Sequence, residues 1–159
     1  MLLLDTWALL TRADLRASEE TLRRWMNAAA LARAGGRVVV AADGSLPTVQ
    51  ALIRWDSPWS AARELAERRE LGFPPAARMA SLTGAAEAVA DLLTTAHLPE
   101  GAELLGPVPA PQGQERMLVR VRRANQAALA RALHEAAGVR TARKAAQPVR
   151  IQVDPLDLL

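Results

Sequence analysis

The spacing of apolar residues divides the chain into two parts of different character. In the first part helical spacing dominates, and Leu22, Trp25, Met26 and Ala29 recur at intervals of three and four residues. In the second part short alternating runs, typical of half-buried strands, lie between helical segments. The two parts meet at Gly72-Phe73-Pro74-Pro75, where neither proline can continue a helix. We therefore expect a domain boundary here, with one part at 1–71 and the other at 72–159.

The first part is predicted to contain two strands and three helices. The apolar run Leu2–Leu4 reads as a buried strand that ends at Asp5, and because a domain seldom begins in this way we expect a fragment. A helix is predicted with Ser18 as its N-cap, Glu19 and Glu20 in its first turn, and its end near Gly35-Gly36. Three further elements follow: a strand at 37–42 closed by Asp43-Gly44, a helix opened by Ser45 and Pro47 and running through Ile53, and a helix from Ser57 to about Leu71.

The second part alternates strands and helices in a recognisable order. The predicted elements are a strand at 78–83, a helix at 85–96, strands at 102–105 and 116–122, a helix capped by Asn125 and a strand at 149–153. This β-α-β-β-α-β order is the split βαβ, or ferredoxin-like, arrangement. The segment from Gly106 to Pro111, with three prolines, is expected to form a rigid loop before the third strand.

Positive charge is concentrated between Arg116 and Arg150. This stretch holds nine basic residues against one acid, Glu135, whereas the remaining residues carry 11 basic and 16 acidic side chains. Such an asymmetry indicates a polyanionic partner. The chain has 19 arginines and one lysine, Lys144, and this skew also fits a GC-rich genome. The high isoelectric point is therefore weaker evidence for a polyanionic partner than the uneven distribution of charge.

The strand from Arg116 places its basic side chains on one face. Arg116, Arg120 and Arg122 alternate with apolar residues, and if the last strand joins the same sheet, Arg120, Arg122 and Arg150 form an exposed guanidinium patch that can contact phosphates. The alternative is an ordinary solvated face. Arg140, Arg143 and Lys144 are placed in a polar loop after the helix, which either contacts a nucleic-acid backbone or serves solubility.

Several kinds of chemistry find no support in the residues. There is no cysteine, and neither His97 nor His134 has a partner at metal-ligand spacing. Phosphate-loop and nucleophile-elbow motifs are missing, and an acidic centre of Asp5, Asp14 and Glu19 is better explained by caps and solvated acids. No apolar run approaches the roughly 20 residues of a membrane span. We expect a cytoplasmic, nucleoid-associated protein without catalytic residues or metal.

Four segments, in order, resemble the C-terminal part of PriA, the primosomal replication-restart helicase family. They are Leu3-Leu4-Asp5 with Asp14–Ala17 and Glu19, Glu64-Leu65 through Arg68-Arg69 to Pro74-Pro75, Leu105–Pro111 leading to Arg116, and Val153-Asp154-Pro155. They are similar to the family's segment after motif V, its hinge, its LGPVPAP loop and its VDP ending. Each segment is short, but their order and spacing cover nearly the whole chain.

One segment departs from the family pattern. Where the family's helicases carry Q..GRAGR, whose arginines act on the ATP γ-phosphate, this chain reads Asn27 to Gly36 with Arg33 as the one arginine. Loss of such arginines costs orders of magnitude in phosphoryl transfer. The family's first ATPase lobe and zinc-binding cysteines are also missing, so the chain is similar to the helicase-deficient branch of GC-rich actinobacteria. ATP and zinc are implied for full-length members and no cofactor for this chain.

The resemblance implies a remnant of a RecA-like second helicase lobe (1–71) followed by a C-terminal DNA-binding domain (72–159). The family's C-terminal domain resembles ribosomal protein S10, itself a split βαβ fold, which agrees with the element order. The expected function is recognition of branched or stalled-fork DNA in replication restart, and hence in repair and recombination, without helicase or ATPase activity. The expected DNA-contacting residues are Arg116, Arg120, Arg122, Arg123, Arg143, Lys144 and Arg150. The alternative is a docking module for replication partners such as single-strand binding protein. A third interpretation, an active ATP-driven helicase, requires a nucleotide site that is not found in this sequence.

Overall fold

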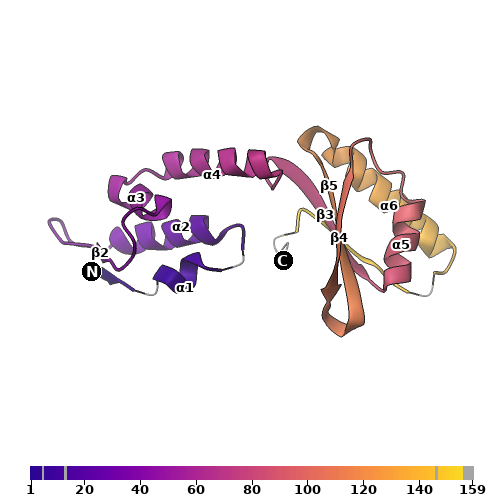
Figure 1. Ribbon diagram of the computed structural model, residues 1–159, viewed down its shortest axis with the longest axis horizontal. Coiled ribbons are helices and arrows are strands. Elements are labelled where there is room, and N and C mark those ends of the chain that lie inside the picture. The colour runs from indigo at the N-terminus through magenta and orange to yellow at the C-terminus, as the bar shows by residue number, and fades with distance from the viewer. Residues whose placement is uncertain (5, 13, 146, 156–159) are drawn as a thin grey trace. The chain divides into compact units, whose positions relative to one another are not determined.

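The computed structural model describes residues 1–4, 6–12, 14–145 and 147–155 of the 159-residue chain. The chain divides into two compact units, one of residues 1–67 and one that begins at Arg68. Figure 1 shows helices beside the short strand β2 in the first unit, and a larger sheet with α5 and α6 in the second. The assignment of these parts to a helicase-lobe remnant and a DNA-binding domain stays a prediction.

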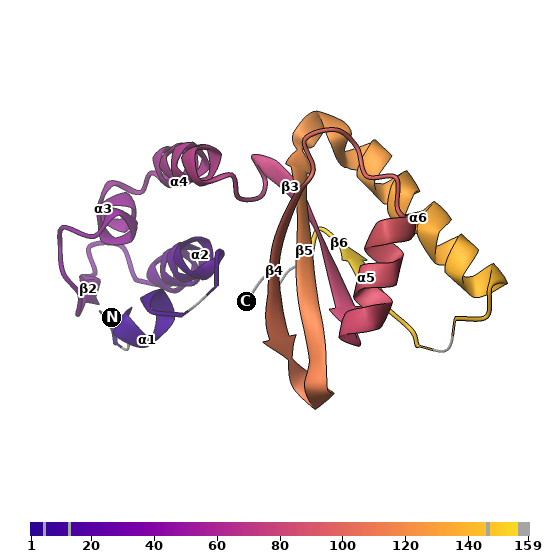
Figure 2. The same cartoon turned by 45° about the vertical axis from the view of Figure 1, so that its right-hand side comes forward.

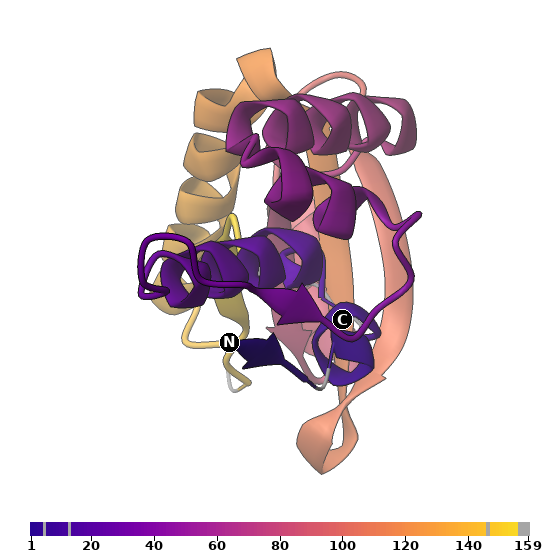
Figure 3. The ribbon, with the colours of Figure 1, turned by 90° about the vertical axis from the view of Figure 1, so that its left-hand side faces the viewer.

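The first unit is mainly helical. Its core is formed by Leu22, Trp25, Val49, Ala51 and Leu52, from the second and third helices. Strands β1 and β2 pair in parallel, with Leu2 opposite Val39, and lie beside each other in Figure 3. The elements are β1 (Leu2–Leu3), α1 (Thr6–Leu10), α2 (Ala17–Ala29), β2 (Val39–Val40), α3 (Pro47–Arg54) and α4 (Ser57–Leu71), the last of which continues into the second unit.

Both ends of α2 differ from the prediction. Ser18 is not the N-cap, because α2 begins at Ala17 and Arg16 takes the cap position without a side-chain hydrogen bond. The preceding turn is closed by Asp14, whose carboxylate accepts the amide of Arg16 at 2.8 Å. At the other end α2 stops at Ala29 and not near Gly35-Gly36, because the chain tightens into i to i−3 hydrogen bonds there.

The predicted strands of the first unit are shorter than expected, and one helix was missed. Strand β2 covers two residues of the predicted 37–42, and β1 ends at Leu3; the expected end at Asp5 lies outside the described residues. Helix α1 has five residues, too few for a periodic pattern to show. The predicted turn at Asp43 is present: hydrogen bonds from the Ser45 amide and hydroxyl, 2.8 Å each, lower the pKa of the Asp43 carboxyl.

The second unit has the predicted split βαβ order. Its sheet has the strand order β4-β5-β3-β6, with every neighbouring pair antiparallel. This is the ferredoxin-like topology, in which β3 and β5 form the centre. The elements are β3 (Ala77–Gly84), α5 (Ala86–Thr95), β4 (Glu103–Ala110), the 3-10 turn η1 (Pro111–Gly113), β5 (Gln114–Arg122), the 3-10 turn η2 (Arg123–Asn125), α6 (Gln126–Ala142) and β6 (Arg150–Val153).

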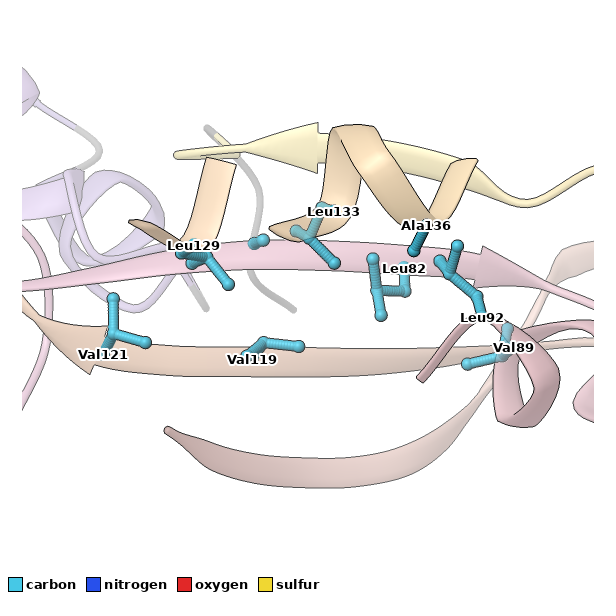
Figure 4. Close-up of a cluster of buried hydrophobic side chains, with 9 residues drawn as sticks. Leu82, Val89, Leu92, Val119, Val121, Leu129, Leu133 and Ala136 are labelled. Atoms are coloured by element: carbon cyan, nitrogen blue, oxygen red, sulfur yellow. The ribbon is translucent and has the colours of Figure 1, made fainter. Parts of the chain in front are cut away.

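Helices α5 and α6 cover one face of this sheet, as Figure 2 shows. Leu82 on β3 and Val119 on β5 point into the same apolar layer as Leu92 of α5 and Leu133 of α6 (Figure 4). All four side chains are at most 1% exposed. Because side chains alternate along a strand, Arg116, Arg120 and Arg122 must lie on the opposite face.

The prediction of a rigid loop from Gly106 to Pro111 is wrong for most of this segment. Residues 106–110 belong to β4, which pairs with β5 on both sides of an irregularity between Leu105 and Val108. Prolines are tolerated because β4 is an edge strand, where a missing amide hydrogen faces away from the ladder. Asn125 does occupy the N-cap position of α6, but its side chain makes no cap and instead donates to the carbonyl of Glu100 at 3.3 Å.

Candidate nucleic-acid interface

The sheet register fixes where the predicted arginines lie. On the face away from α5 and α6, Arg122 is opposite Ala77, Arg120 is opposite Met79 and Arg116 is opposite Thr83. Arg150 of β6 lies on the other side of Thr83, in the same row as Arg116. The four arginines therefore share one face, as predicted, but they are spread along its whole length.

Arg120 is already engaged by neighbouring groups. One guanidinium nitrogen pairs with the carboxylate of Glu103 on β4 at 2.5 Å, and another lies 3.2 Å from the carbonyl of Leu71 and 3.4 Å from that of Gly72. The Arg120 charge thus sits at the C-terminal end of α4, where a cation is favourable. Its side chain is 24% exposed. Arg120 holds the α4–β3 connection and does not offer a free guanidinium.

A second arginine supports the same connection. The side chain of Arg68 donates to the carbonyl of Pro74 at 3.0 Å, while the Phe73 amide bonds the Arg68 carbonyl at 2.9 Å. Arg68 and Pro74 belong to the segment that resembles the family's hinge. This hydrogen bond explains why the arginine and the proline are six residues apart in that segment. From the last turn of α4 the Arg68 side chain reaches the Pro74 carbonyl, which has no helical amide as a donor.

Arg122 and Arg123 border a groove of about 930 Å³ at the end of the sheet where β5 finishes. Both side chains are exposed and have no ion-pair partner among the described residues. The groove, called here the Arg122 groove, is lined by Arg120 and by six exposed charged residues: Arg69, Glu70, Glu100, Glu103, Arg122 and Arg123. The hydrogen bond from Asn125 to Glu100 ties the groove wall at residues 99–101 to the start of α6.

A second basic group, called here the Thr83 corner, comprises Arg116 and Arg150, which flank Thr83 on the face away from α5 and α6. Arg143, Lys144 and Arg150 are exposed. Lys144 follows α6 on the helix side of the sheet, where it lines a hollow of about 410 Å³ with Leu92, Val149 and Ile151. The carbonyl of Pro148 approaches β3 so closely that a Cβ on Gly84 would lie 3.0 Å from it.

The two groups lie at opposite ends of the sheet. Ala77 and Thr83 are six residues apart on β3, and at about 3.3 Å per residue this separates Arg122 from the row of Arg116 and Arg150 by ~20 Å. The expected single patch of Arg120, Arg122 and Arg150 is therefore divided: Arg120 is engaged, and Arg122 and Arg150 are exposed at different ends.

Arg140 was expected in the basic loop but is a buried residue of α6. It is 7% exposed, forms an ion pair with Asp91 of α5 and donates to the carbonyl of Gln147 at 2.8 Å. Because helix α6 continues to Ala142, the predicted loop begins only at Arg143. Arg140 therefore joins α5, α6 and the segment before β6.

Two groups of the second unit were not foreseen. Arg69 of the groove follows Arg68 in the last turn of α4, and a basic pair before a helix-ending glycine is the signal that could have drawn attention to it. Asp154 of the VDP ending pairs with Arg78 of β3 at 3.1 Å and accepts from Gln126 of α6 at 3.2 Å, while its amide bonds the Met79 carbonyl. Asp154 thus joins β6, β3 and the start of α6.

No group of three His, Cys, Asp or Glu residues suited to a metal occurs in the described part of the chain. None of its described helices is both long and apolar enough to cross a membrane.

Comparison with known proteins agrees with the resemblance found in the sequence. The chain is 50% identical over 172 residues to the probable replication restart protein PriA of Mycobacterium leprae, and the match covers 99% of this chain and 26% of that protein. It is 48% identical over 179 residues to the corresponding proteins of Mycobacterium tuberculosis and Mycobacterium bovis, covering 99% of this chain and 27% of each.

The chain thus spans about a quarter of the length of these curated relatives. Residues 69–156 match the family model described as the primosomal protein N C-terminal domain. This range contains the complete split βαβ unit, from β3 to β6, and the last turn of α4 that carries Arg69. The predicted similarity to the C-terminal part of PriA is confirmed, and the chain belongs to the PriA C-terminal domain family.

Proposed function

We propose that this chain holds branched or stalled-fork DNA in replication restart and does so without an ATP-driven helicase activity of its own. The observation that carries the proposal is the exposure of five of the predicted basic side chains in a protein of net charge +3. These are Arg122, Arg123, Arg143, Lys144 and Arg150. The relatives' name, probable replication restart protein PriA, supports the process in which such binding would act.

The second unit is suited to binding DNA through its charged side chains and not through stacking of bases on aromatic rings. From residue 74 onward the sequence contains no aromatic residue, so bases cannot stack on tyrosine, tryptophan or phenylalanine there. Guanidinium groups instead donate forked hydrogen bonds to phosphate oxygens and release counterions. DNA binding by this unit should accordingly weaken steeply with salt.

The absence of helicase activity rests on the segment after α2. Arg33 is exposed and is the one arginine between Asn27 and Gly36, where an ATPase of the resembled family would place a pair. A single exposed guanidinium without the rest of a nucleotide site stabilises no transferring phosphoryl group. DNA-stimulated ATP hydrolysis by the purified chain would contradict this part of the proposal.

The experiment measures affinity for a forked DNA as a function of salt. A double variant with Arg122→Ala and Arg150→Ala, one residue from each basic group, should reduce the slope of log affinity against log salt by about two, since each phosphate contact contributes roughly 0.9. The control carries Arg37→Ala and Arg131→Ala, which are also exposed and remove the same charge. Equal slopes for the two variants would refute the proposal.

A docking role remains the second candidate because the edge strand β4 exposes Leu104 and Val108. In that role β4 receives a replication partner such as single-strand binding protein, and the arginines receive an acidic tail. A pull-down with single-strand binding protein, with and without its acidic tip, separates the two. Retention that depends on the tip, with no affinity for forked DNA, would favour docking.

A further inference from the structure

The Arg122 groove has a charge pattern that simple phosphate binding does not explain. Arg69, Arg122 and Arg123 share it with Glu70, Glu100 and Glu103, and all six side chains are exposed. Glu103 is partly neutralised by Arg120, but Glu70 and Glu100 have no ion-pair partner among the described residues. Carboxylates repel a phosphate backbone, so the groove suits a ligand that presents hydrogen-bond donors as well as anions.

Unpaired nucleotides present both kinds of group. The amino group of cytosine donates to a carboxylate, and an unstacked base lies flat on a guanidinium plane, while the adjoining phosphate accepts from a second arginine. In a duplex the Watson–Crick edges are occupied by the partner strand. A groove of about 930 Å³ between residues 69–72 and residues 99–103 therefore matches a short single-stranded segment better than a duplex.

The Thr83 corner has the opposite character. The cross-strand partners of Arg116 are Thr83 and Val108, and that of Arg150 is Thr83, so no carboxylate lies beside either arginine in the register. Across three strands Arg116 and Arg150 are ~10 Å apart. Unmixed positive charge of this kind suits the continuous phosphate backbone of a duplex.

Building on the proposed function, we propose that the two ends of this unit bind different parts of one DNA fork. The Arg122 groove takes unpaired nucleotides, with Arg122 and Arg123 on phosphates and Glu70 and Glu100 on base amino groups. The Thr83 corner takes the backbone of a duplex arm. A DNA fork contains single-stranded and duplex DNA close enough together to reach two sites ~20 Å apart. The preference for branched DNA then arises because the groove and the corner bind the same fork at once.

Two matched double variants of the full chain test this assignment. Arg122→Ala with Arg123→Ala alters the groove, and Arg116→Ala with Arg150→Ala alters the corner; each pair removes two charges. Binding is measured to a single strand and to a blunt duplex of equal length. The groove variant should lose about tenfold in single-strand affinity and less than about threefold for the duplex, and the corner variant should do the reverse.

A third variant, Glu70→Ala with Glu100→Ala, separates base contacts from net charge. The unchanged chain should bind a cytosine tract more tightly than a thymine tract, because thymine has no amino group, and the variant should lose this difference. Tighter binding of every strand by the variant, or equal losses on both DNAs in the two arginine variants, would overturn the division of the two ends. No salt-dependent binding of any DNA by the unchanged chain would instead refute the proposed function itself.

Discussion

Arg120 and Arg122 are two residues apart on one strand face, yet their surroundings give them different roles. Arg120 binds Glu103 and the carbonyls at the end of α4, whereas Arg122 ends β5 with its guanidinium exposed. Alternation along a strand fixes the face of a side chain but not its partners. The strand pattern alone therefore could not tell which arginine is available for DNA.

Substituting these two arginines separately should divide stability from binding. Arg120→Ala removes an ion pair and the hydrogen bond to the Leu71 carbonyl, so the free energy of unfolding should fall by about 1–2 kcal/mol. Arg122→Ala should change it by less than about 0.5 kcal/mol but lower the salt slope of DNA binding by about one. Denaturant titration and salt titration of the same two proteins check both statements. Equal stability of the two variants would contradict the role given to Arg120.

Arg140 should be required for stability and not for DNA contact. Its guanidinium is buried between Asp91 and the Gln147 carbonyl, and Arg140→Ala removes a hydrogen-bonded ion pair at a cost of about 2–3 kcal/mol. Thermal unfolding should show a clearly lower midpoint. Arg131→Ala, exposed on the same helix, is the control and should shift it little. A change in DNA affinity at matched folded fraction would show that Arg140 contacts DNA after all.

Among the elements, β4 shows most plainly where backbone conformation limits substitution. Gly106 has a φ of +116°, and a Cβ there would lie 3.0 Å from the Arg116 carbonyl and 3.3 Å from the Val108 amide. In α6, Gly138 has open space around a Cβ and an ordinary helical position. Substitution by alanine is therefore expected to have opposite effects on stability at the two glycines.

Gly106→Ala should destabilise the protein by about 2 kcal/mol, since an L side chain is strained at that φ and meets backbone atoms. Gly138→Ala should stabilise it by about 0.5–1 kcal/mol, because alanine loses less conformational entropy in a helix. Denaturant midpoints of the two variants provide the measurement. A stabilising effect at Gly106 would mean that β4 is not held in this conformation.

Long periodic elements were predictable from the sequence and short or edge elements were not. Helices α4, α5 and α6 and strands β3, β5 and β6 follow the predicted pattern within a few residues. Elements α5, α6, β3 and β5 bury apolar residues, whereas α4 buries none and is marked in the sequence by Ser57-Pro58 at its start and Gly72 after its end. The prolines at 107, 109 and 111 indicated a loop, yet Pro107 and Pro109 fit an edge strand whose outer amides need no partner, and only Pro111 begins a turn. The groove combines α4, the 99–103 segment and β5, and no local pattern can specify such an assembly.

At the scale of the whole molecule, each unit has a hydrophobic core of its own. Leu22, Trp25 and Leu52 belong to the first core, while Leu82 and Leu129 belong to the second, and among the described residues the two cores have no buried residue in common. All four tryptophans lie within residues 1–67. Tryptophan fluorescence therefore reports unfolding of the first unit, whereas circular dichroism reports both.

Separate cores predict separate unfolding of the two units. Leu82→Ala removes a fully buried side chain from the second core and should cost that unit about 2–5 kcal/mol. In denaturant, the circular dichroism signal of the variant should then begin to fall at a lower concentration while the fluorescence transition stays in place. Leu52→Ala, in the first core, should move the fluorescence transition instead. A common shift of both signals in either variant would show that the units unfold as one cooperative body, and the two binding ends would then have to be tested in a chain whose first unit is intact.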